Sequence, residues 1–143
     1  MRGMIGAALV VLVAAATGQV SHADDLSDRY DRVRCVCDDT LWQIQQSPIV
    51  LVSPPYIVQR DAALEEAQSA IRLCDDAKIW LLSSQDWMRA WRQAMIRGDR
   101  VAADQAYTAY CGAVQGCRQR LDNAETTAKT AAYYMACAYS WIQ

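Results

Sequence analysis

The chain has 143 residues, of which 14 are basic and 16 acidic, and its formal net charge at pH 7 is -2. This length favours a single domain. Because acidic and basic residues are interspersed along the sequence, it offers no basic face, and binding to nucleic acid is not expected.

Residues 1–23 have the three-part layout of a secretory signal peptide. A short basic start at Arg2 precedes an apolar run over 5–16, and residues 21–23 form a small-x-small cleavage site. The apolar run is shorter than the roughly 20 residues that a membrane-spanning helix needs. The sequence therefore predicts a cleaved signal peptide and a single domain, residues 24–143, that is secreted or periplasmic.

The predicted mature chain contains no histidine, because the single histidine, His22, lies in the signal peptide. This excludes Ser-His-Asp and Cys-His catalysis, histidine-based zinc enzymes and haem attachment through a C-x-x-C-H motif. We accordingly expect no catalytic residue, no metal site and no cofactor.

Apolar residues recur at helical spacing over 25–46, which we expect to form the first helix of the domain. Pro48 ends this helix. The β-branched run at 49–52 has the local propensity of a strand, but the sequence offers no second strand to pair with it. We therefore expect a short extended connector, closed by the serine and two prolines at 53–55.

Two further helices are expected over 59–82 and 85–97. The serines at 83–84 separate them, since serine is favoured at helix N-caps. Gly98 is suited to the left-handed position that follows a helix end. Asp99 is suited to the N-cap of the next helix.

Small or apolar residues recur over 103–142 in alternating steps of four and three, which indicates a helical face turned towards one partner surface. They are Ala103, Tyr107, Tyr110, Val114, Cys117, Leu121, Ala124, Ala128, Ala131, Met135, Ala138 and Ile142. We expect two helices here, over 100–121 and from Asp122 to Trp141, with Asp122 and Glu125 as a capping box. The alternative is one helix about 60 Å long, which exceeds the roughly 30–35 Å diameter of a compact domain of this size. The predicted fold is thus all-α, a compact bundle of four to five helices.

Six cysteines follow the predicted signal peptide, which is typical of a disulfide framework in an oxidising compartment. Folding the helices back about the predicted turns brings specific pairs face to face. The expected bonds are Cys111–Cys137, Cys37–Cys74 and Cys35–Cys117. Metal binding by the C-x-C pair at 35–37 is the less favoured alternative.

Two glycines, Gly112 and Gly116, lie about one helical turn apart. In lipid this spacing would mark a dimerisation face. In a soluble helix it lets a neighbouring element approach closely, and we expect this second role.

The aromatic residues give the positive indication of function, because the chain has five tryptophans and seven tyrosines but no phenylalanine. Trp and Tyr are favoured on half-wet surfaces and, with Arg, at binding hot spots. We predict a binding patch formed by Trp87, Arg89, Trp91 and Arg92. The alternative is that these tryptophans fill the core.

The expected function is binding of another protein, as an inhibitor, immunity protein, effector or adaptor. One alternative is a structural or accessory subunit of an envelope or extracellular complex. A second is a carboxylate-dependent hydrolase, which would place two carboxylates across a cleft, drawn from Glu65, Glu66, Glu125 and the aspartates.

Overall fold

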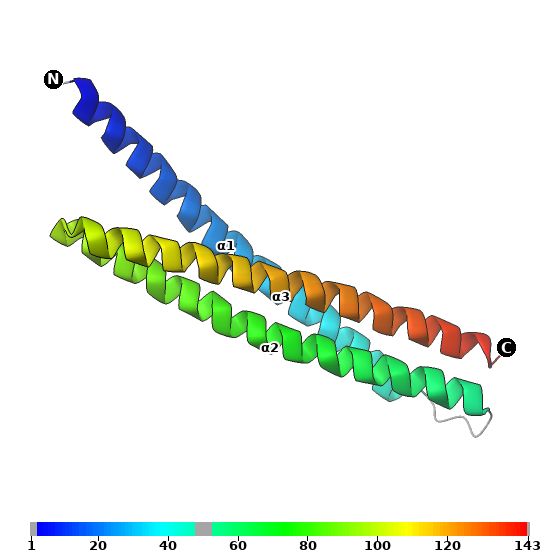
Figure 1. Ribbon diagram of the computed structural model, residues 1–143. Helices are drawn as coiled ribbons and strands as arrows, with labels where there is room; N and C mark the ends of the chain where they lie inside the picture. The colour runs from blue at the N-terminus through cyan, green and yellow to red at the C-terminus, as the bar shows by residue number, and fades with distance from the viewer. Residues whose placement is uncertain (1–2, 48–52, 143) are drawn as a thin grey trace.

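The computed structural model consists of three helices, α1 (Gly3–Gln46), α2 (Pro54–Arg97) and α3 (Arg100–Ser140). The structure describes residues 3–47 and 53–142, and the side chains of residues 25–47 and 53–142. α2 and α3 run antiparallel along their whole length, while α1 lies beside only part of this pair and its first half departs from it (Figure 1). The described chain is therefore all-α, as predicted, but elongated.

The number of helices was predicted wrongly, since α2 continues through the serines that were expected to break it. Ser84 is fully buried, and its hydroxyl donates to the carbonyl of Leu81 at 2.6 Å. The hydroxyl is therefore satisfied inside the helix and occupies a core position where a small side chain fits. The expected extended connector at 49–52 lies outside the described residues.

α3 likewise continues through Asp122, where a helix break was predicted. Asp122 and Glu125 do not cap a helix, because both lie within α3 and accept hydrogen bonds from Arg29 of α1, at 2.5 and 3.1 Å. The argument for a break assumed a globular shape. An elongated molecule accommodates α3, whose 41 residues span about 60 Å.

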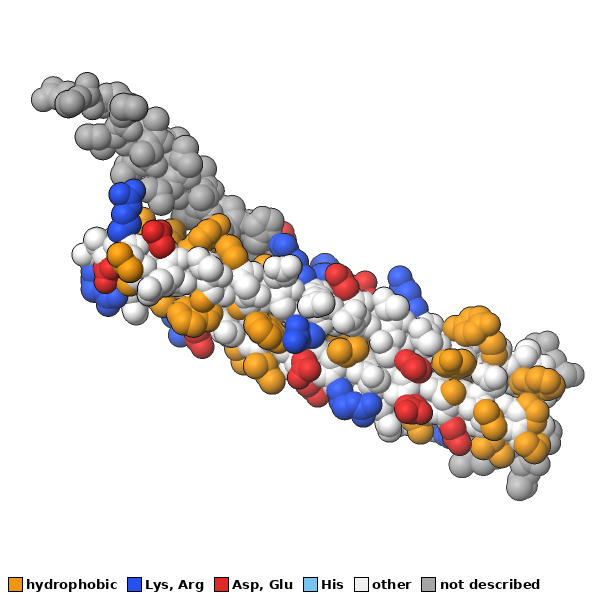
Figure 2. Space-filling model, in the orientation of Figure 1, with side chains coloured by type: hydrophobic (Ala, Val, Ile, Leu, Met, Phe, Trp, Pro, Cys, Tyr) orange, Lys and Arg blue, Asp and Glu red, His pale blue; other side chains and the backbone are white. Residues whose placement is uncertain are grey.

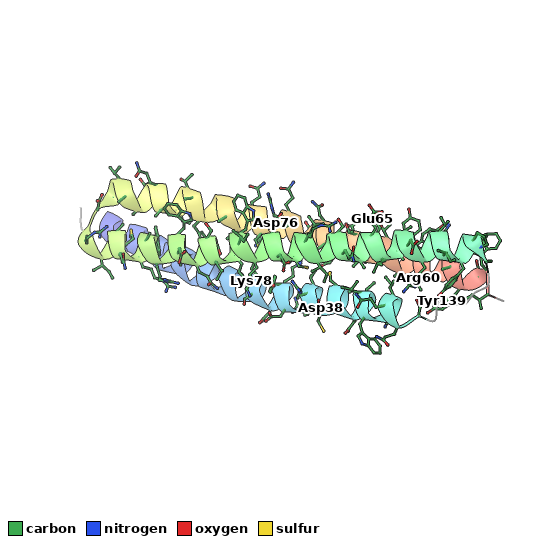
Figure 3. All side chains as sticks on the ribbon, turned by 90° about the horizontal axis from the view of Figure 1, so that it is seen from below. Asp38, Arg60, Glu65, Asp76, Lys78 and Tyr139 are labelled. Carbon is green, nitrogen blue, oxygen red and sulfur yellow. The ribbon has the colours of Figure 1, made fainter. Side chains whose placement is uncertain are left out.

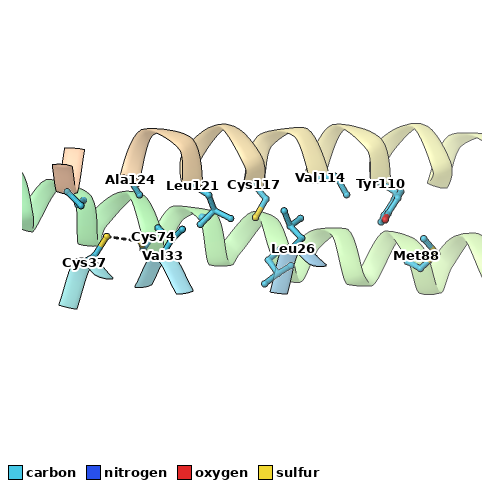
Figure 4. Packing of buried hydrophobic residues seen from close by; sticks show 14 residues of the cluster. Leu26, Val33, Cys37, Cys74, Met88, Tyr110, Val114, Cys117, Leu121 and Ala124 are labelled. Carbon is cyan, nitrogen blue, oxygen red and sulfur yellow. Dashed lines mark hydrogen bonds between the residues drawn. The ribbon is translucent and has the colours of Figure 1, made fainter. Parts of the chain in front are cut away.

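Alanine is the commonest buried residue on α2 and α3, and the buried positions of both helices recur at helical spacing. The buried alanines are Ala63, Ala67, Ala70, Ala77 and Ala94 on α2, and Ala103, Ala106, Ala113, Ala124, Ala128, Ala131 and Ala138 on α3. The helical face predicted over 103–142 is confirmed as buried except at Tyr107 and Ile142, which are exposed. Larger side chains, drawn in Figure 4, fill the core where α1 joins the pair.

The turn between α2 and α3 has the predicted chemistry. Gly98 adopts a left-handed conformation, with φ 71°, and its N–H donates to the carbonyl of Met95 at 3.2 Å. Asp99 caps α3, because its carboxylate accepts from the N–H of Ala102 at 3.1 Å. These two residues reverse the chain in a short turn between α2 and α3.

Only one of the two neighbouring glycines of α3 provides a close approach. A Cβ at Gly116 would lie 2.7 Å from the indole of Trp80, whereas a Cβ at Gly112 would meet nothing within 4 Å. The guanidinium of Arg120 lies 4.7 Å from the centre of the same indole ring. The indole of Trp80 therefore packs against the backbone of α3 at Gly116 and against the guanidinium of Arg120.

Substitution of the N-cap tests the turn. Asp99→Ala should lower the free energy of unfolding by about 1 kcal/mol, because the N–H of Ala102 loses its acceptor. Urea denaturation followed by circular dichroism measures this loss. Asp104→Ala, at an exposed position five residues further on, should change stability by less than about 0.5 kcal/mol. Equal losses in the two variants would show that the cap does not stabilise α3.

The two glycines provide a second, matched test. Gly116→Ala should lower the free energy of unfolding by about 1–3 kcal/mol, since the new methyl group displaces the Trp80 ring. Gly112→Ala should raise it by up to about 1 kcal/mol, because alanine favours the helix and nothing opposes its side chain. Thermal unfolding of both variants measures the difference, and a shift of the same sign in both would contradict the packing described for Trp80.

Candidate functional site

One end of the molecule is built from stretches of sequence without charged residues, bordered by Arg60, whose guanidinium donates to the hydroxyl of Ser47 at 3.0 Å. The sequence has no charged residue from Thr40 to Gln59 and none from Thr130 to Gln143. α1 ends, α2 begins and α3 ends at the same end of the molecule (Figure 1), so these two stretches come together there. We name residues 40–47, 53–59 and 130–142 the uncharged end.

Large apolar side chains are exposed at the uncharged end on all three helices. Trp42 on α1 and Tyr133 on α3 are 62% and 66% exposed. The other exposed members are Ile57, Val58, Tyr139, Trp141 and Ile142. Figure 2 shows hydrophobic side chains gathered at this end, with acidic and basic side chains along the middle of the molecule. Exposed apolar groups in such number at one place are typical of an interaction surface.

A groove between α1 and α3 opens beside these aromatic residues. Its volume is about 250 Å³, and its floor is formed by Ile44 and Met135. Gln43 and Tyr139 lie at its rim, and the small Ala136 leaves the space open. The groove exists because α1 makes its least extensive contact with α3. It offers an apolar recess with amide and phenol groups at the edge.

Ion pairs attach α1 to the other helices in the middle of the molecule. Arg29 bonds Asp122 and Glu125 of α3, as described above, and Arg34 bonds Asp38 of its own helix at 3.1 Å. Arg34 also pairs with Asp75 of α2. Asp38, and the further charged residues Asp76 and Lys78, lie along this middle part, whereas Tyr139 lies towards the uncharged end (Figure 3). The ion pairs that hold α1 thus lie away from the aromatic residues of the uncharged end.

Two cysteines meet in the core between α1 and α2. Cys37 and Cys74 are fully buried, and their sulfur atoms share a hydrogen bond at 3.7 Å (Figure 4). The bond to Cys74 and burial together raise the pKa of the Cys37 thiol. Burial also raises the pKa of Cys117, to about 11. The thiols of Cys37 and Cys117 are therefore protonated at neutral pH while the helices are packed, whereas the hydrogen bond with Cys37 lowers the pKa of Cys74.

All six cysteines are free thiols in this structure, and the positions of the helices contradict two of the three predicted disulfides. Cys111 and Cys137 lie on one continuous helix, 26 residues apart, so about 39 Å of helix separates them. The contacts of Arg29 place Cys35 level with residues near 130 of α3, roughly 20 Å from Cys117 along the axis. Only the Cys37–Cys74 pair has its predicted proximity.

The four predicted binding residues do not form one patch. Trp87 is 42% exposed, whereas Trp91 packs against the core. Arg89 pairs with Asp86 at 3.4 Å and points about 200° around the helix from Trp87. Arg92 is also exposed. Their role in binding stays a prediction, and Trp87 is the exposed tryptophan of the four residues.

Of the glutamates of the hydrolase alternative, Glu65 and Glu66 are adjacent on α2, and Glu125 lies on α3. Glu125 is engaged by Arg29, while Glu65 is exposed on α2. Of the grooves described here, neither the one at the uncharged end nor a second of about 270 Å³ beside Arg29 and Lys129 is lined by Glu65.

Sequence reasoning missed the uncharged end, although the signal was present. Residues 40–59 and residues 130–143 include no charged residue, and a count of charges along the sequence would have found these two stretches. Among the described residues, no helix has a stretch both long and apolar enough to cross a bilayer. No family model, curated protein or solved structure matches this chain, so the site is characterised by its own residues.

Proposed function

We propose that the protein is a small secreted or periplasmic helical protein that acts by binding another protein, and that the uncharged end is its binding surface. The observation that carries this proposal is the exposure of Trp42, Tyr133, Tyr139 and Trp141 on stretches of sequence without charged residues. An inhibitor, an immunity protein, an effector and an adaptor all act through a surface that binds another protein.

The composition of the uncharged end supports protein binding on energetic grounds. The cores of protein interfaces are depleted of charge and enriched in aromatic residues, because a buried charge must be desolvated. Trp and Tyr supply a large contact area with few rotatable bonds, and their polar atoms can still form hydrogen bonds. The amides of Gln43, Gln45 and Gln46 and the hydroxyl of Thr40 add uncharged donors and acceptors nearby.

The groove beside Tyr139 supports the same proposal. Binding hot spots pair a protruding side chain with a recess on the partner. The floor of Ile44 and Met135 would accept an apolar side chain of the partner, while Gln43 and Tyr139 fix its orientation. If the bound protein is a second copy of this chain, the protein is a structural subunit instead, and its oligomeric state distinguishes the two cases.

A capture experiment with matched variants tests the binding surface. The folded protein, immobilised without reductant, is exposed to envelope and culture extracts, and the affinity of a stoichiometric partner is then measured. Trp42→Ala and Tyr139→Ala should each weaken that affinity at least tenfold, as expected for hot-spot residues. Raising the salt concentration should weaken it little, because screening acts on charges that this surface lacks.

Two other variants serve as controls for position. Ile79→Ala removes a side chain that is 65% exposed in the middle of α2, and it should leave the affinity within about twofold of wild type. Trp87→Ala examines the patch predicted from sequence. Weakening by Trp87→Ala or Ile79→Ala, with Trp42→Ala and Tyr139→Ala neutral and all variants folded, would place the binding surface elsewhere.

A further inference from the structure

The thiols of Cys37 and Cys74 are the cysteine pair that the fold brings into contact. They come from different helices, lie 37 residues apart in sequence and have their sulfur atoms 3.7 Å apart. A disulfide needs a sulfur separation of about 2 Å. Both side chains already point towards each other across the α1–α2 interface (Figure 4), and the disulfide requires the two sulfur atoms to move closer.

The neighbouring cysteines have different surroundings. Cys35 precedes Cys37 by two residues, so it points about 200° away around the helix, and it is exposed beside Asp39. Cys111 is exposed on α3, whereas Cys117 is buried there. Proximity and burial thus select Cys37 as the partner of Cys74 and exclude the adjacent Cys35.

A covalent bond between these two thiols would strengthen the attachment of α1 to α2. The packed segment of α1 contacts the other two helices less extensively than those helices contact each other. Cys37 lies near the middle of this segment, one turn after Arg34, which pairs with Asp75 directly beside Cys74. The ion pair and the two thiols hold the same register of α1 on α2. A bond at this point would fix the helix that forms one wall of the groove at the uncharged end.

We propose that Cys37 and Cys74 form a reversible disulfide that locks α1 onto α2, and that the other four cysteines take no part in it. The oxidant is the disulfide of an oxidoreductase or of oxidised glutathione. The two thiols give up two protons and two electrons, one sulfur–sulfur bond forms between them, and the oxidant's disulfide is reduced to two thiols. Because both sulfurs are fully buried when α1 is docked, exchange takes place while α1 is undocked. This inference is independent of the proposed function.

Peptide mapping tests the connectivity. The full chain is folded with oxidised glutathione, alkylated without reduction, digested and analysed by mass spectrometry. We expect the Cys74 peptide to be joined to the peptide that begins at Cys35, with fragmentation assigning the link to Cys37. Cys35→Ser is the matched control and should retain the link, whereas Cys37→Ser should lose it. A link from Cys74 to Cys35, or a Cys74 that is alkylated in the oxidised folded chain, would overturn the proposal.

Hydrogen exchange tests the effect on α1. Closing a loop of this length should slow the opening of α1, and the exchange of its amides over 26–46, by roughly 10²- to 10³-fold relative to the reduced protein. Oxidised and reduced wild type are compared, so the result does not depend on whether Cys74→Ser folds. The amides of α2 and α3 away from α1 should change much less. Equal exchange rates for the α1 amides in the oxidised and reduced protein would show that the disulfide does not hold α1 on α2.

Discussion

The close packing of α2 against α3 through alanines is the constraint on which the rest of the structure depends. Each alanine buries little apolar surface, so an interface made of alanines must be long to be stable. This explains why both helices run unbroken for 44 and 41 residues. It also explains why positions that resemble helix breaks, such as Ser84, remain helical. A small residue in the interface preserves the packing, and its hydroxyl is satisfied by the preceding turn.

α1 completes this scaffold and differs from it in chemistry. It packs with larger residues, such as Leu26 and Val33, and adds ion pairs at Arg29 and Arg34. Because it meets α3 less extensively than α2 does, it leaves a groove beside that helix. Because α1 and α3 form the two sides of the groove, the groove exists only while α1 is packed on the other helices. The buried thiols at the α1–α2 contact lie where that attachment is controlled.

Much of this fold was predictable, and the errors have definite physical causes. The helical periodicity, the Gly98 and Asp99 turn and the end of α1 follow from local chemistry, and each was predicted. The break at Asp122 was wrong because an acidic residue that can cap a helix can equally pair with an arginine from another helix. Gly116 was correctly expected to allow close approach, but Trp80 as its partner was visible only in three dimensions. The candidate surface was missed because its residues come from separate stretches of sequence.

The sequence by itself determined the all-α class, the positions of the apolar faces and the absence of charge over two long stretches. These are local properties of spacing, propensity and composition. Tertiary structure alone decided that the molecule is elongated, that the two charge-free stretches meet at one end and that Cys37 faces Cys74. The physical reason is that such contacts depend on helix length and register. Register is set by many weak contacts along the alanine interface, and no single residue encodes it.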